Sequence, residues 1–92
     1  PKEIGWQPEA EALLQSLLKS VPALFRALVR WRVAKNAEYL ASATRSVSTE
    51  QVIRSFILSS AKVTRFRVRQ PLIDHGIDLE RYAADFAAEE RL

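Results

Sequence analysis

The amino-acid sequence predicts an all-α fold, a compact bundle of four to five short helices. Apolar residues recur at helical spacing, helix-initiating residues precede these runs, and the only segment that alternates like a strand has no second strand to pair with. The 92 residues are 48% hydrophobic and 27% charged. This composition is typical of one globular domain. We therefore predict a single helical domain over residues 1–92.

The first two helices are predicted from prolines. Pro8 suits a first turn because proline needs no amide partner there, and the acidic residues that follow it favour the positive end of the helix. This helix should run to about residue 19. Pro22 repeats the signal and predicts a long second helix over about 22–41.

A capping box predicts the third helix. In Ser48-Thr49-Glu50-Gln51, the serine hydroxyl and the glutamine side chain are expected to satisfy free amides of the first turn. The helix should cover about residues 49–60.

The segment 64–69 is ambiguous, because its arginines alternate with Phe66 and Val68 in the period-two manner of a strand. A helix is the better prediction, ending or bending around Pro71, with Gly76 as a left-handed stop. Asp78 should then cap a last helix. The predicted core consists of Leu13, Leu14, Leu17, Leu18, Phe25, Val29, Val33, Leu40, Val52, Phe56, Ile57, Tyr82 and Phe86.

Several classes of protein and site are excluded by composition. The chain has no cysteine and only one histidine, His75, so thiolate sites and multi-histidine metal sites are impossible. We see no catalytic constellation and no phosphate-binding loop, and we expect no cofactor and no small-molecule substrate. No apolar run is long enough to span a membrane and nothing resembles a signal peptide, so we expect a cytoplasmic protein. His75 precedes Gly76 and is expected to cap a helix end, in preference to a pigment-binding or acid–base role.

Charge is distributed unevenly along the chain. The net charge is +3, but residues 19–69 hold eleven basic and two acidic residues, whereas residues 70–92 sum to −4. A basic centre with acidic ends suits docking onto an anionic surface, and it suits internal pairing of the ends with the middle equally well.

The second predicted helix holds polar residues within its apolar face. Arg32 and Asn36 lie there at i, i+4 spacing, so either a carboxylate elsewhere in the fold meets Arg32 or this part of the face contacts a partner. Trp31 borders the same face and is either a core residue or an interface residue.

The densest basic cluster follows the third helix. Arg65, Arg67 and Arg69, with Lys62 and Arg54 nearby, form either a solvated face or a contact surface for phosphates, acidic lipids or a carboxylate-rich protein. The candidate partner-binding residues are Trp31, Arg32, Asn36, Arg54, Lys62, Arg65, Arg67 and Arg69.

Four stretches resemble a known family: Trp6-Gln7-Pro8-Glu9-Ala10-Glu11-Ala12, Val21-Pro22 with Arg26, Lys35-Asn36-Ala37-Glu38 with Ala41, and Val47-Ser48-Thr49-Glu50-Gln51-Val52. Together they resemble the small C-terminal domain of the B subunit of light-independent protochlorophyllide reductase, which also occurs as a stand-alone protein. The resemblance covers residues 6–55 and leaves 56–92 as an extension. The spacings from Trp6 to Pro22 and from Pro22 to Asn36 are each longer than in the family by about one helical turn.

The resemblance implies a helical accessory module of tetrapyrrole or photosynthetic machinery without the reductase's catalytic core. We therefore predict a non-catalytic subunit or assembly factor that docks through a basic face on a larger protein complex with an acidic surface. Attachment to an anionic membrane, such as a photosynthetic one, and nucleic-acid binding are the alternatives. Nucleic acid is the less favoured partner, because no compact recognition helix and few stacking aromatics accompany the arginines.

Overall fold

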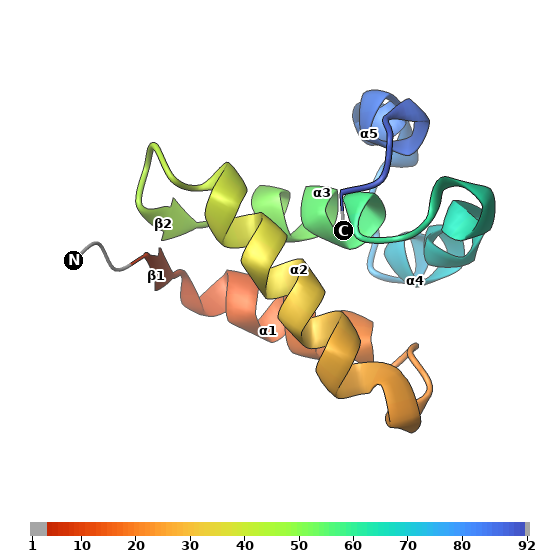
Figure 1. Ribbon diagram of the computed structural model, residues 1–92, viewed down its shortest axis with the longest axis horizontal. Coiled ribbons are helices and arrows are strands. Elements are labelled where there is room, and N and C mark those ends of the chain that lie inside the picture. The colour runs from red at the N-terminus through yellow and green to blue at the C-terminus, as the bar shows by residue number, and fades with distance from the viewer. Residues whose placement is uncertain (1–3, 92) are drawn as a thin grey trace.

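Helix α3 (Thr49–Leu58) lies at the centre of the computed structural model, which describes residues 4–91. It packs against α1 (Pro8–Leu18), α2 (Arg26–Leu40) and α5 (Ala83–Ala87). Figure 1 shows α1 and α2 crossing each other next to one part of α3, while the C-terminal elements gather around its other end. Most of α3 is buried, namely Val52, Ile53, Ser55, Phe56, Ile57 and Leu58.

The remaining elements are short. They are the 3-10 segments η1 (Ala23–Phe25), η2 (Lys62–Val68) and η3 (Leu79–Tyr82), the helix α4 (Arg69–Asp74), and two strands, β1 (Gly5–Trp6) and β2 (Ser46–Val47). The strands pair in parallel, with Gly5 opposite Ser46 and Trp6 opposite Val47. The predicted all-α bundle of four to five helices is confirmed, because residues 4–91 hold five α-helices. Strands of two residues show no alternation, so this pairing was not predicted.

Helix starts follow the predicted signals. Helix α1 begins at Pro8, and α2 is preceded by η1 directly after Pro22. At the start of α3, Oε1 of Gln51 accepts hydrogen bonds from the backbone amide of Ser48 at 2.8 Å and from its hydroxyl at 3.2 Å. Asp78 caps η3 by accepting a hydrogen bond from the backbone amide of Glu80 at 3.1 Å.

Helix α4 ends as predicted at a left-handed glycine. Gly76 has φ 74°, and its amide donates to the carbonyl of Ile73 at 2.9 Å, while the next amide donates to Leu72 at 3.1 Å. This arrangement satisfies carbonyls that the helix end leaves open. Nδ1 of His75 lies 2.7 Å from the carbonyl oxygen of Pro71, so the ring contacts the same helix end.

The core agrees with the prediction at most positions. The residues predicted and found buried are Leu14, Leu17, Leu18, Val33, Val52, Phe56, Ile57 and Tyr82, and those half-buried are Leu13, Val29, Leu40 and Phe86. The prediction for Phe25 is wrong: its side chain is 51% exposed because η1 projects beyond the elements that cover α2.

Trp6 closes the end of the bundle near the strands. Its side chain is half-buried, and Nε1 donates a hydrogen bond to Oε2 of Glu38 at 2.8 Å. Because Glu38 belongs to α2, this bond joins β1 to α2. The start of the described chain is thereby tied to the second helix.

Two leucines near the same helical pair test this packing. Leu14 is fully buried, whereas Leu24 is 85% exposed. We expect Leu14→Ala to lower the free energy of unfolding by about 2–5 kcal/mol through lost burial and cavity formation. Leu24→Ala should change it by no more than about 0.5 kcal/mol. Urea unfolding followed by circular dichroism measures both, and equal effects of the two substitutions would contradict the fold.

Candidate docking surface

Arg65 lies in the interior. Its side chain is 2% exposed, and its guanidinium donates to the carbonyls of Asp85, Phe86 and Ala88 at 2.9, 3.1 and 2.6 Å and to that of Ser60 at 3.0 Å. Asp85 and Phe86 belong to the short helix α5, Ala88 follows it, and Ser60 follows the end of α3. Helix ends leave carbonyls without partners in the helix itself, and Arg65 supplies donors there. The prediction that Arg65 belongs to an exposed contact surface is therefore wrong.

The period of η2 explains the error. A 3-10 helix has three residues per turn, so positions i and i+3 share a face. Arg65 and Val68 are three apart and both are buried, while Phe66 and Arg67 between them are exposed. The helical prediction for this segment is confirmed, but the alternation of arginine with apolar residues did not indicate which arginines reach the surface.

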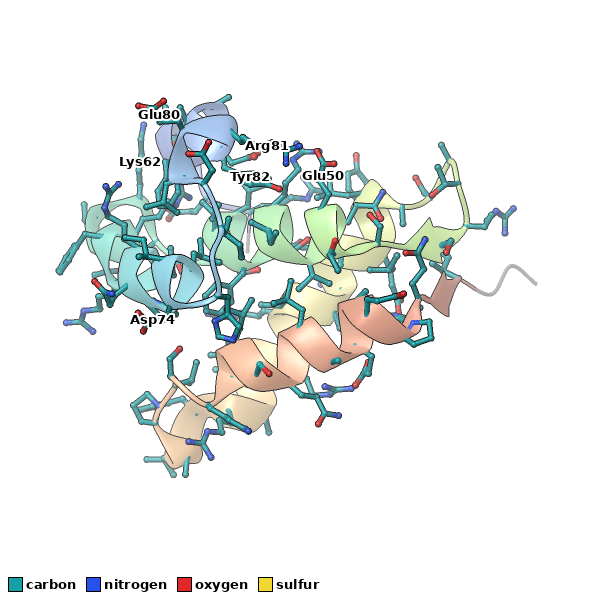
Figure 2. The ribbon with its side chains drawn as sticks, turned by 180° about the vertical axis from the view of Figure 1, so that it is seen from behind. Glu50, Lys62, Asp74, Glu80, Arg81 and Tyr82 are labelled. Atoms are coloured by element: carbon teal, nitrogen blue, oxygen red, sulfur yellow. The ribbon has the colours of Figure 1, made fainter. Side chains whose placement is uncertain are left out.

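Arg54 and Lys62 pair with the acidic C-terminal part of the chain. Nε of Arg54 lies 3.2 Å from Oδ1 of Asp85, and Nζ of Lys62 lies 3.5 Å from Oε2 of Glu89. Figure 2 labels Lys62 on the same side of the molecule as η3. Internal pairing of the basic centre with an acidic end, one of the two interpretations of the charge pattern, is thus observed. A contact of either residue with a partner stays a prediction.

Asn36 is buried because it joins three segments. Its Nδ2 donates to Oγ of Ser59 at 2.9 Å and to the carbonyl of Arg91 at 2.7 Å. The amide of Arg91 donates in turn to the carbonyl of Leu58 at 2.7 Å. Asn36 is 5% exposed and its amide nitrogen is occupied, so the expectation that it lies on a contact surface is corrected.

Arg32 is different, because its charge has no partner. The side chain is half-buried, and among residues 4–91 it forms no hydrogen bond and no ion pair. It lines a groove of about 340 Å³ between the α1–α2 connection and η2. Of the two possibilities that the sequence left open for Arg32, an internal carboxylate is not found within this part of the chain.

The groove has apolar walls and basic edges. Val21, Phe25 and Val29 contribute on one side, and Phe56 and Val68 on the other. Arg67 joins Arg32 in the lining, together with Ser20, Ser59 and Ser60, and none of the described residues that line the groove is acidic. Arg67 and Arg69 are exposed and form no ion pair within residues 4–91. Of the predicted basic residues, the structure therefore brings Arg32 and Arg67 together at one groove.

An exposed apolar ridge runs along α2 and η1. Leu24, Leu28 and Trp31 are 85%, 47% and 58% exposed. Leu28 and Trp31 are three positions apart and share one side of α2, and Leu24 precedes them in η1. Nζ of Lys35 lies 4.6 Å from the centre of the Trp31 ring. The sequence predicted that Trp31 borders the core face. It did not predict that Leu24 and Leu28 are exposed. The available signal was that apolar residues occur all around α2, including the side opposite Val33.

A second group of polar side chains lies away from the groove. Figure 2 shows Glu50, Arg81 and Tyr82 near one another where η3 meets α3. Burial raises the pKa of the Tyr82 phenol.

Within residues 4–91 no group of three or more histidine, aspartate or glutamate residues is arranged to hold a metal ion. In the same part of the chain, no helix has the length and apolar character needed to cross a membrane.

Arg30 and Glu11 connect α2 to α1 outside the core. Arg30 Nη2 donates to Glu11 Oε2 at 2.8 Å, and this bond, with a second from Gln15, holds the pKa of Glu11 below its ordinary value. The pair therefore stabilises the fold above the ordinary pKa, and this contribution is lost as the pH falls through the lowered value.

An NMR titration of Glu11 tests this pair. Arg30→Gln should raise the pKa of Glu11 toward its ordinary value, while the free energy of unfolding falls by less than about 1 kcal/mol because the pair is exposed. An unchanged Glu11 titration in the variant would contradict the pairing.

Arg65 and Arg67 form a matched pair for testing which arginine is structural. Arg65→Met should lower the free energy of unfolding by about 3–5 kcal/mol, because several buried carbonyls lose a charged donor. Arg67→Met should stay within about 0.5 kcal/mol. Chemical unfolding of both variants decides the matter, and similar losses would mean that Arg67 is also structural.

Comparison with known proteins identifies a family. A family model described as protein of unknown function, DUF2621, matches residues 2–86, and the chain belongs to this family. The match runs through residues 6–55 and continues over most of the remainder. Comparisons with curated proteins and with solved structures give no match.

Proposed function

We propose that the chain is a non-catalytic docking subunit or assembly factor that binds a larger protein complex. Its docking surface consists of the ridge of Leu24, Leu28 and Trp31 and the adjoining groove that Arg32 and Arg67 line. The observation that carries the proposal is the exposure of this ridge along η1 and the first half of α2. The proposal that the chain binds a partner rests on this surface.

The ridge supports a protein partner because of its composition and position. A helix with apolar residues on opposite sides is stable in water when both sides pack against something. Helix α3 packs against one side of α2, and the ridge on another side is exposed. Tryptophan is among the residues most enriched at the energetic centres of protein interfaces. Neighbouring large apolar side chains that are exposed to solvent are typical of interaction sites.

The charges near the ridge favour a partner with an acidic surface. Arg32 and Arg67 have no carboxylate partner within residues 4–91, and Lys35 lies over the Trp31 ring. Arg26 contributes less, because its guanidinium donates to the carbonyls of Val21 and Lys19 at 2.8 and 3.2 Å. Complementary potentials across an interface raise specificity and the association rate.

A complex of chlorophyll synthesis or photosynthesis is the partner class to test first, with location at a photosynthetic membrane as part of the same proposal. The support is the resemblance of residues 6–55 to the reductase domain. Several resembling residues begin elements, such as Pro8 in α1 and the Ser48 to Gln51 capping box of α3. The resemblance therefore bears more directly on a shared fold than on a shared partner.

Nucleic acid is a weaker candidate. Arg54 and Lys62 are paired with carboxylates and Arg65 is buried, so much of the basic surplus counted in the sequence is engaged internally. A chain that neutralises several phosphates needs those cations at its surface. An anionic membrane remains an alternative outcome of the tests below.

Affinity capture with matched baits tests the docking surface. The wild-type chain, Trp31→Ser and Ile73→Ser serve as baits in an extract of the native source. Ile73 lies on α4 and is 47% exposed, comparable with the ridge leucine at position 28. We expect the wild type and Ile73→Ser to capture the same complex, and Trp31→Ser to lose at least about tenfold in affinity for it.

Equal capture by all three baits would contradict a role for the ridge. Cosedimentation with anionic vesicles in place of any protein capture would favour the membrane alternative. Arg65 is left unchanged in every bait, because its substitution is expected to destabilise the fold.

A further inference from the structure

We infer that the groove between the α1–α2 connection and η2 binds a short partner segment that carries an apolar side chain next to carboxylates. The inference rests on the proposed function and names the chemistry of the partner at one part of the docking surface. Arg32 and Arg67 would hold the carboxylates, and the apolar walls would enclose the side chain.

The volume and lining of the groove suit such a segment. At about 340 Å³ it lies near the lower end of the range of ligand pockets, which is room for one large apolar side chain and adjoining polar groups. Val29 and Phe56 are the apolar residues of the two helices that approach there, and the former is half-buried while the latter is buried. A side chain inserted between them would lose its contact with water.

The unpaired charge of Arg32 indicates the second component. A guanidinium that is partly removed from water is unfavourable without an anion or several acceptors, and Arg32 has neither within residues 4–91. Its planar donor group matches the two oxygens of a carboxylate. Arg67, which lies on the opposite wall, adds a second cation, and among residues 4–91 no acidic side chain lines the groove. A carboxylate for these two cations would therefore come from the occupant.

Continuity with the ridge favours a protein segment over a free anion. Phe25 lines the groove and follows directly after Leu24 of the ridge, and Arg32 follows directly after Trp31. Phe66, next to Arg67, is 64% exposed. A small anion would leave these side chains in water, whereas a chain that crosses the groove onto the ridge would cover them.

Selection from short random peptides displayed on phage tests the inference. The bait is the 92-residue chain, and the variants Arg32→Gln, Arg67→Gln and Arg81→Gln are screened with the selected peptides. We expect enrichment of peptides with glutamate or aspartate beside a large apolar residue. Their affinity should fall at least about tenfold for Arg32→Gln and for Arg67→Gln, and stay unchanged for the distant, exposed Arg81→Gln.

Two further measurements keep the result decisive. Thermal unfolding shows whether Arg32→Gln still folds, and Arg67→Gln, which changes an exposed residue, gives an independent answer. Amide chemical shifts of Val29, Arg32 and Val68 should move when a selected peptide is added, and the same spectra are recorded with dodecanoate as a probe for a lipid-like carboxylate.

Each outcome has a defined meaning. Selected peptides without acidic residues, or affinities that do not depend on Arg32 and Arg67, would overturn the inference. Saturation of the groove by dodecanoate with no peptide binding would overturn it in favour of a fatty-acid ligand. If Trp31→Ser abolishes capture of the native complex while Arg32→Gln and Arg67→Gln capture it normally, the proposed function stands and the groove inference fails. If selected peptides bind as expected but Trp31→Ser captures the complex normally, the ridge proposal fails alone.

Discussion

The guanidinium of Arg65 occupies the place where the ends of α3 and α5 meet, and it donates to four carbonyl oxygens there. A helix end leaves carbonyls without partners, and two such ends brought together in the interior would each be costly. Arginine has enough donors in one plane to serve both ends, which a lysine ammonium with three donors does not. Arg65 therefore fixes α5 to the end of α3, and the ion pair between Arg54 and Asp85 supports the same junction.

The same arrangement divides the charges of the molecule into two groups. Arg54, Lys62 and Arg65 hold the acidic C-terminal part against the centre. Arg32 and Arg67 lie on another part of the surface, beside apolar walls and an apolar ridge. A net charge alone does not separate these groups. The positions of the carboxylates in space decide which cations hold the fold together and which stay without a carboxylate in the described part of the chain.

The helices could be predicted from the sequence because their signals are local. Pro8, the Ser48–Gln51 capping box, Asp78 and Gly76 each act within one turn of their own position. The site was harder, because burial depends on what packs from elsewhere. Arg65 and Arg67 look alike in the sequence, yet a 3-10 turn and the arrival of α5 bury one of them. Phe25 and Leu24 look like core residues, yet both side chains in η1 are exposed.

The hydrogen bond from Asn36 to the carbonyl of Arg91 joins residues 55 positions apart in the chain. During synthesis on a ribosome, α1, α2 and α3 can associate long before residue 91 has left the exit tunnel, because their contacts are closer in sequence. The amide of Asn36 and the end of α3 must then stay hydrated until the segment that contains Arg91 arrives. We therefore expect vectorial folding to pass through a three-helix intermediate that closes only in a late step.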